Sequence, residues 1–127
     1  MENTNFQQEK QHLYKKWLKE FHCLEVIETE HGFMTYAIVK DKCVIYDMYV
    51  DPDHRGSRES AKMADMISSI AKENGANKLI GFVPINQPYP EVSLKCQLNY
   101  GFKILMIEKD KITLEKELDN GCDKTGR

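Results

Sequence analysis

The hydrophobic positions along the chain follow helical and strand periods, which predict a mixture of helices and strands. Near the N-terminus, apolar side chains recur at helical spacing and predict a helix with an apolar face made of Leu13, Tyr14, Trp17, Leu18 and Phe21. Two hairpin strands are predicted at 23–29 and 33–39, with a turn at 31–32 where glycine can take a positive φ. Residues 43–50 are apolar on both faces except for Asp47, which indicates a central strand covered on two sides.

The second half of the chain continues this alternation. Pro52 ends the strand at 43–50, and a polar loop at 51–57 leads into an amphipathic helix at 58–74. The remaining predicted elements are a strand at 78–83, a proline-rich loop at 84–90, a short helix at 91–99 and a hairpin at 102–108 and 111–116. Residues 1–118 are therefore expected to form one α+β domain with a mixed, mostly antiparallel sheet flanked by helices, followed by a flexible tail at 119–127.

Composition and charge narrow the class of protein. The chain has 127 residues, enough for one domain, and its 18 basic and 20 acidic side chains give a net charge of −2. This balance argues against a dedicated nucleic-acid-binding domain, which normally carries a basic excess. No apolar run approaches the roughly 20 residues of a membrane span, and the N-terminal residues lack the apolar stretch of a signal peptide. We therefore expect a cytoplasmic protein without a membrane partner.

The cysteines and histidines give no metal signature. Cys23, Cys43, Cys96 and Cys122 lie far apart without a C-x-x-C pair, which fits reduced thiols in the cytoplasm better than a zinc site or a disulfide scaffold. The four histidines are equally scattered along the sequence. No metal site is predicted.

The loop that leaves the apolar strand and opens the long helix is the most chemically suggestive segment. Unpaired backbone N–H groups and the helix dipole at such a helix start favour an anion, best a phosphate or pyrophosphate. Arg55, Arg58 and Lys62 add cationic side chains around it. The alternative is an ordinary helix start, with Ser57 as N-cap, Glu59 complementing the dipole and solvated basic side chains.

Residues 43–67 resemble the central motif of the GCN5-related N-acetyltransferases, the GNAT superfamily. In that pattern an apolar strand ends in Val-x-Pro, and Arg/Gln-x-x-Gly-x-Gly/Ala then opens a helix; here the matching segments are Val50 to Pro52 and Arg55 to Ser60. Downstream, residues 98–102 read Leu-Asn-Tyr-Gly-Phe and resemble the family's helix that ends in Gly-Phe before the next strand. The resemblance covers roughly residues 5–118 and implies the acyl-CoA N-acyltransferase fold, with a V-shaped mixed sheet.

The resemblance also implies acetyl-CoA as co-substrate and assigns residues to it. Backbone groups of Met48, Tyr49 and Val50 would contact the pantetheine arm and the acetyl carbonyl, and a backbone N–H near Val50 would stabilise the oxyanion. The pyrophosphate would lie on the loop formed by Arg55, Gly56, Ser57, Arg58, Glu59 and Ser60.

The sequence departs from the family pattern at three positions. Arg58 stands at the second glycine position, Ser60 at the final Gly/Ala position, and Gln97 where the family usually has the tyrosine that reprotonates the coenzyme thiolate. Tyr100 and Tyr89 are the nearby substitutes for this general acid, and we take Tyr100 as the candidate.

A general base must take a proton from the amine, and Asp47 is the best carboxylate on the central strand. Glu25 or Glu28 acting through water is a second choice, and a purely structural hydrogen bond is the alternative role for Asp47.

Two functions follow from these observations. The first is an acetyl-CoA-dependent N-acetyltransferase that transfers an acetyl group to a small-molecule or protein primary amine by direct attack. The alternative, favoured by the altered loop and the missing tyrosine, is a catalytically impaired GNAT-like binding or structural module. The C-terminal hairpin also offers an exposed edge strand through which a homodimer can form.

Overall fold

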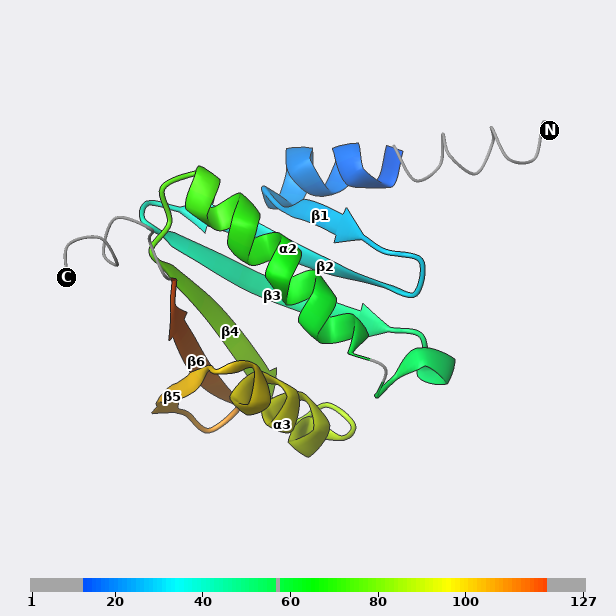
Figure 1. The fold of residues 1–127 in the computed structure, drawn as a ribbon, viewed down its shortest axis with the longest axis vertical. Helices are drawn as coiled ribbons and strands as arrows, with labels where there is room; N and C mark the ends of the chain where they lie inside the picture. Colours follow the sequence, from blue (N-terminus) through cyan, green and yellow to red (C-terminus); the bar gives the residue numbers. More distant parts are fainter. Residues whose placement is uncertain (1–12, 57, 119–127) are drawn as a thin grey trace.

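The computed structural model describes residues 13–56 and 58–118 and contains a six-stranded mixed sheet with helices packed against it (Figure 1). The strands are β1 (Glu25–Glu28), β2 (Gly32–Val39), β3 (Lys42–Val50), β4 (Lys78–Pro84), β5 (Lys103–Ile107) and β6 (Lys111–Glu117). The helices are a segment at residues 13–22, a 3₁₀ turn η1 (Pro52–His54), α2 (Glu59–Glu73) and α3 (Pro90–Tyr100). The predicted order of elements and the α+β fold class are confirmed over the described residues, whereas Ser57 and the tail at 119–127 lie outside them.

The strand order in the sheet is β1-β2-β3-β4-β6-β5. Neighbouring strands run antiparallel except β3 and β4, which are parallel and are joined by α2 as a crossover helix. No helix among the described residues has the length and apolar character needed to cross a membrane.

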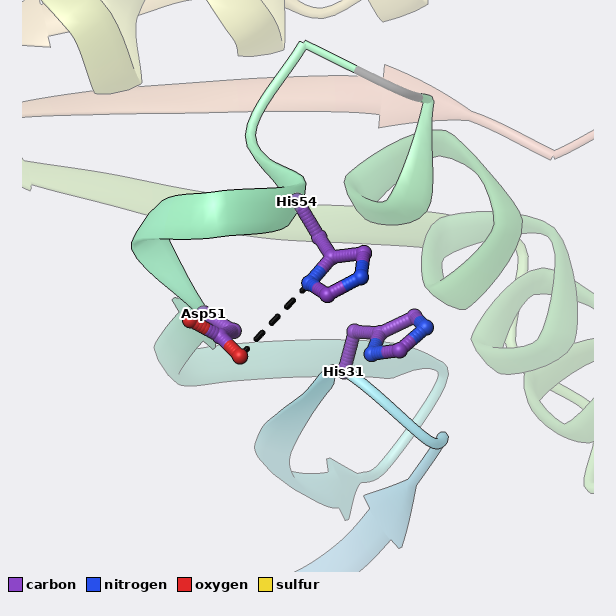
Figure 2. A group of neighbouring side chains, drawn as sticks. All are labelled: His31, Asp51 and His54. Carbon is purple, nitrogen blue, oxygen red and sulfur yellow. Dashed lines mark ion pairs between the residues drawn. The ribbon is translucent and has the colours of Figure 1, made fainter.

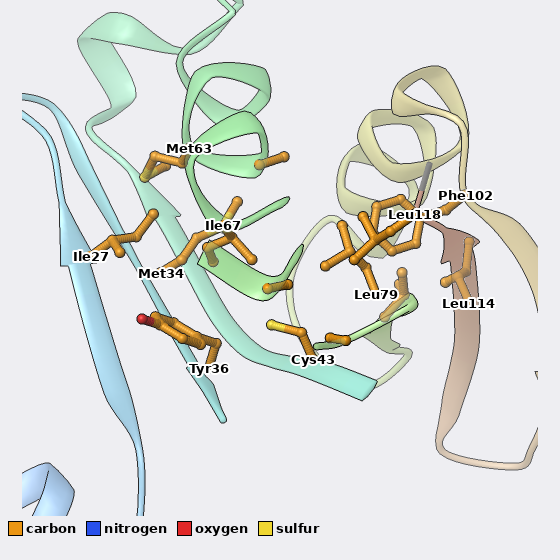
Figure 3. Close-up of a cluster of buried hydrophobic side chains, with 14 of the residues drawn as sticks. Ile27, Met34, Tyr36, Cys43, Met63, Ile67, Leu79, Phe102, Leu114 and Leu118 are labelled. Carbon is orange, nitrogen blue, oxygen red and sulfur yellow. The ribbon is translucent and has the colours of Figure 1, made fainter. Parts of the chain in front are cut away.

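The core lies between α2 and the sheet, and it continues under the β4–β6 half. Met63 and Ile67 of α2 face Met34 and Cys43 on the adjacent strands (Figure 3), and three of these four side chains are fully buried. The same cluster extends through Leu79, Phe102, Leu114 and Leu118 on the other side of the molecule. Each buried aliphatic side chain of this kind contributes about 1.5–3 kcal/mol to folding, so the cluster fixes the position of β3.

The N-terminal helical segment does not bury most of its predicted apolar face. Leu18 is buried, but the other four members of that face are 48–66% exposed: Leu13, Tyr14, Trp17 and Phe21. The physical reason is that this helix lies beside the edge strand β1, where Lys15 and Lys19 form ion pairs with Glu28 and Glu25. Its position at an edge leaves most of the apolar stripe uncovered among the described residues.

β3 is the central strand that its sequence predicts, but only one of its faces is well covered. The register of β2 with β3 passes from Tyr36 opposite Ile45 to Thr35 opposite Asp47, so Tyr46 is the extra residue of a β-bulge. The bulge reverses which residues face α2. Val50 therefore belongs to the core, whereas Asp47 and Tyr49 are exposed on the opposite face.

β3 and β4 separate soon after they begin. Their parallel pairing consists of Lys42 with Lys78, Cys43 with Leu79 and Val44 with Ile80, and it stops just before the bulge. Beyond this point β3 continues to Val50 and β4 to Pro84 as the two arms of a V (Figure 1). Because a bulge bends and twists its strand, Tyr46 accounts for the divergence.

Candidate functional site

The divergence leaves the backbone of β3 without a strand partner on its β4 side from Ile45 onward, within the described residues. Met48, Tyr49 and Val50 occupy this stretch, as the sequence predicts. Free backbone N–H and C=O groups on a strand can bind an extended ligand in the way that a sheet edge binds a peptide. The V therefore offers a place for a long, amide-containing molecule.

Arg55 fastens the loop that follows β3. Its Nε donates a hydrogen bond of 3.0 Å to the carbonyl oxygen of Val50, and its guanidinium carbon lies 5.5 Å from the centre of the Tyr49 ring. The side chain therefore positions the loop against the end of β3, and its contact with an anion stays a prediction.

Arg58, which stands at a glycine position of the family pattern, has a backbone conformation that favours glycine. It precedes α2 with φ 67° and ψ 20°, the left-handed region, which costs a residue with a side chain about 1 kcal/mol. Its side chain is exposed, and the first N–H groups of α2 have no intrahelical acceptors. Arg58 thus adds a cation beside a helix N-terminus that already favours anions.

The carboxylate of Glu59 lies on the inner side of this helix start. Glu59 is 5% exposed and accepts a hydrogen bond from the hydroxyl of Thr29, at the end of the β1–β2 hairpin. That hydrogen bond holds the pKa of Glu59 below its ordinary value, and the positive charge of Lys62 acts in the same direction. Glu59 therefore ties α2 to the hairpin, so that only its backbone is placed to face an anion.

Asp47 is positioned by a buried threonine. The Thr35 hydroxyl, which is 2% exposed, donates a hydrogen bond of 2.7 Å to Oδ2 of Asp47. Asp47 itself is exposed, on the face of the sheet opposite α2. On the arms of the V, the rings of Tyr46 and Phe82 lie 6.1 Å apart. The hydrogen bond from Thr35 thus presents a fixed carboxylate to solvent.

Tyr100 joins the two helices. Its hydroxyl donates a hydrogen bond of 2.6 Å to Oδ1 of Asp65 on α2 and lies 3.4 Å from the hydroxyl of Ser68. Burial raises the pKa of Tyr100, and the hydrogen bond to Asp65 raises it further. The phenol therefore stays protonated at neutral pH.

Gln97 stands in place of the usual tyrosine and contacts the backbone of β4. Its Nε2 donates a hydrogen bond of 3.0 Å to the carbonyl oxygen of Phe82. A Cβ on Gly81 would collide with its Oε1, which is buried and has no hydrogen-bond partner among the described residues. Gln97 therefore fastens α3 to β4, one arm of the V. Because an amide does not ionise, its side chain cannot act as a general acid.

The sequence does not identify Thr35 as a contributor to this site. Thr35 pairs with Asp47 only in the register of the folded hairpin, so no sequence signal marks it. Tyr46 is a candidate cleft-lining aromatic from its sequence, and its exposed side chain fits that prediction.

No protein-family model matches the sequence, and no curated protein matches it. Solved structures do match. PaiA N-acetyltransferase from Thermoplasma acidophilum, in complex with coenzyme A, has a TM-score of 0.67 and 16% identity over 85% of this chain and 70% of its own. Nourseothricin acetyltransferase matches with a TM-score of 0.63 and 17% identity over 70% of this chain.

A third similar structure is a protein from Desulfovibrio desulfuricans named as an acetyltransferase of the GNAT family, with a TM-score of 0.64 and 15% identity over 73% of this chain. The chain spans 58% of the length of nourseothricin acetyltransferase and 65% of the Desulfovibrio protein. With the split sheet, the bulged central strand and the left-handed loop before α2, these matches show that the chain has the GNAT fold of the acyl-CoA N-acyltransferases.

Proposed function

We propose that this protein is an acetyl-CoA-dependent N-acetyltransferase that acetylates a primary amine. The observation that carries the proposal is the junction of the open arm of β3 with the exposed, left-handed Arg58 at the start of α2. The segment from β3 to the start of α2 thus combines backbone groups that can bind a pantetheine-like arm with a positively charged site for an anion. The names of the similar structures, all three acetyltransferases, support the same activity.

The residues present fit the coenzyme. Met48, Tyr49 and Val50 would hold its amide-containing arm through their backbone, and the loop from Arg55 to Ser60 would hold its pyrophosphate. When bound, acetyl-CoA supplies an acetyl thioester whose acyl group an amine can take. The fixed backbone N–H near Val50 is suited to stabilise negative charge on an acyl oxygen.

Asp47 is the proposed general base. Its exposed carboxylate is oriented by Thr35 and can take a proton from an amine directly or through one water. Glu25 and Glu28 are less suited, because both already form ion pairs with lysines of the N-terminal helix. The rings of Tyr46 and Phe82, which lie 6.1 Å apart on the two arms of the V, favour an acceptor amine with an apolar or aromatic body, on either a small molecule or a protein.

Tyr100 is the proposed general acid. Its raised pKa keeps the hydroxyl protonated at neutral pH, and the O–H can supply a proton to a leaving thiolate once it rotates away from Asp65. The hydrogen bond to Asp65 fixes the direction of the phenol on α3, on the same helix as Gln97.

The alternative is a GNAT-like module that binds its ligands without efficient turnover. The position of Gln97 favours it, because a non-ionising amide occupies the place of the family's acid and is locked onto Phe82.

A thiol-release assay with acetyl-CoA and a panel of primary amines separates these functions. We expect thiol release with at least one amine, and Asp47→Asn should lower kcat by about 100-fold or more while binding of CoA is unchanged. Asp110→Asn, in the exposed turn between β5 and β6, is the matched control and should leave kcat unchanged. Binding of CoA without release from any amine would favour the module, and absence of CoA binding would contradict both.

A further inference from the structure

Three side chains that are far apart in the sequence converge beside the coenzyme loop. His31 lies in the β1–β2 turn, Asp51 directly follows β3, and His54 ends the η1 turn (Figure 2). One donor atom from each, two imidazole nitrogens and a carboxylate oxygen, lies within 4.8 Å of the others. The two imidazole rings are stacked with centroids 3.4 Å apart and planes 9° from parallel.

The backbone that carries these side chains is fixed by hydrogen bonds. Asp51 N–H donates to the carbonyl oxygen of His31 at 2.7 Å, which ties the turn to the end of β3. His54 N–H donates to the carbonyl oxygen of Asp51 at 2.8 Å. The carboxylate of Asp51 accepts from the Asp53 N–H through Oδ1, and its Oδ2 lies 3.5 Å from Nδ1 of His54. The backbone positions of the three donor residues are therefore fixed, and only their side chains need to move to complete a metal site.

The donor set has the chemistry of a transition-metal site. Imidazole nitrogens suit zinc, copper and nickel, and a carboxylate oxygen completes many zinc sites with three protein ligands and one open position. A tetrahedral zinc ion with bonds of about 2.0–2.1 Å places its ligand atoms about 3.4 Å apart. The in-plane lone pairs of two nearly parallel imidazoles do not converge, so one ring must rotate out of the stack, and the donor atoms must move inward by about 1 Å from their present spread of up to 4.8 Å.

Charge and access also favour a cation. Oε1 of Glu30 lies 3.4 Å from Nε2 of His31, and the carboxylate of Glu59 is close enough for both histidines to influence it. The side chains of His31, His54 and Asp51 are 28%, 39% and 47% exposed, so an ion can enter from solvent and keep a water ligand. The negative charges of Glu30 and Glu59 near the two imidazoles would offset the charge of a divalent ion.

We propose that His31, Asp51 and His54 form a binding site for a divalent transition-metal ion of the zinc type. The ion clamps the β1–β2 turn to the loop that runs from β3 to α2. This site lies outside the residues proposed to hold the coenzyme and does not depend on the proposed acetyltransferase activity.

Zinc binding to the full chain, measured by calorimetry with zinc chloride in a buffer with a non-thiol reductant, tests the site. We expect binding of one ion at micromolar concentrations and a higher Tm in its presence. His31→Gln and His54→Gln should each weaken binding at least about tenfold and abolish the rise in Tm. His22→Gln is the matched control, because His22 packs on Trp17 in the N-terminal helix, and it should bind zinc like the parent protein.

Two further measurements keep the test decisive. If a histidine variant fails to fold, Asp51→Asn keeps an acceptor oxygen for Asp53 N–H and should still lower the affinity. Cobalt(II) as a spectroscopic substitute should give bands of nitrogen and oxygen coordination without a thiolate charge-transfer band. Equal zinc affinity in the parent and in both histidine variants, binding only at millimolar zinc, or a thiolate band from cobalt would each overturn the proposal.

Discussion

The two halves of the sheet are covered to very different extents. On the β1–β2–β3 half, α2 buries an unbroken stripe of side chains consisting of Glu59, Met63, Ala64, Ile67 and Ala71. On the β4–β6–β5 half, α3 has no fully buried residue and β5 is exposed along its whole length. The halves therefore differ in their covering elements: α2 packs tightly on the β3 half, whereas α3 and β5 cover the buried side chains of β4 and β6 lightly.

The proposed site lies at the seam between these halves. Only a short parallel ladder joins β3 to β4, and Tyr100 with Asp65 adds a bridge between the helices. Regions with few buried contacts open at low free energy, whereas core elements open only near global unfolding. The contact of α2 with the sheet therefore holds β3 and the anion loop in place, whereas α3 and β5 are the elements able to adjust around a long ligand.

The largest predicted difference between the two halves is the loss in free energy of unfolding when a side chain of each covering helix is truncated. Ile67 of α2 is fully buried, and Ile67→Ala should lower the free energy of unfolding by about 3–4 kcal/mol through the lost transfer energy and the cavity. Leu94 of α3 is only partly buried, and Leu94→Ala should cost about 1 kcal/mol. Urea denaturation of the two variants measures both values, and equal losses would contradict the asymmetry.

Gly32→Ala should have the next largest effect. A Cβ at this position would lie 2.5 Å from the carbonyl oxygen of Tyr49 and 3.0 Å from Cε of Met63, so the turn or the end of β3 must move. We expect a loss of about 2 kcal/mol and weaker CoA binding, measured by urea denaturation and calorimetry. Gly75→Asn is the control, because a Cβ there meets nothing within 4 Å and asparagine tolerates the left-handed conformation. A Gly32→Ala protein with unchanged stability would show that this close approach is not required.

Tyr100→Phe tests the bridge between the halves. Loss of its hydrogen bond to Asp65 should lower the free energy of unfolding by about 1 kcal/mol, and a double-mutant cycle with Asp65→Asn should show coupling of similar size. The proposed acid role predicts in addition a loss in kcat much larger than the loss in stability. An unchanged kcat would remove Tyr100 from the chemistry and leave its bridging role intact.

The smallest predicted effect is a difference in reactivity between buried Cys43, on the covered face of β3, and exposed Cys23. Burial raises the pKa of the Cys43 thiol to about 11, so at pH 8 only about one thiol in a thousand is ionised. Iodoacetamide at pH 8, followed by peptide mass spectrometry, should label exposed Cys23 and leave Cys43 unmodified in the native state. Since the folded pKa exceeds the ordinary value of 9.0, the contribution of Cys43 to stability should fall as pH rises from about 9 to 11. Rapid native-state labelling of Cys43 would contradict the packing of this half.

The sequence predicts the elements well because local periodicity and turn residues determine them. The helix expected at 58–74 is α2 at Glu59–Glu73, and the strand expected at 43–50 is β3 at Lys42–Val50. The loop pattern around Arg55 and Gly56 also leads to the correct fold. These features depend on neighbours along the chain, which a single sequence contains.

What the sequence does not predict depends on register between distant segments. The bulge at Tyr46 and the pairing of Thr35 with Asp47 arise only when β2 and β3 align. A side chain at position 32 would collide with the carbonyl oxygen of Tyr49, and Gly32 does not use the positive φ that its position in a turn suggests. His31 likewise meets His54 because the hairpin turn folds back to the end of β3.

Titration of ¹⁵N-labelled protein with CoA, followed by amide chemical shifts, tests residue by residue whether the seam beside β3 binds the coenzyme. We expect saturable shifts at residues 48–50 and 58–61, with the amides of β5 at residues 103–107 unchanged. No shifts at millimolar CoA, or shifts confined to the β5–β6 hairpin, would contradict this expectation.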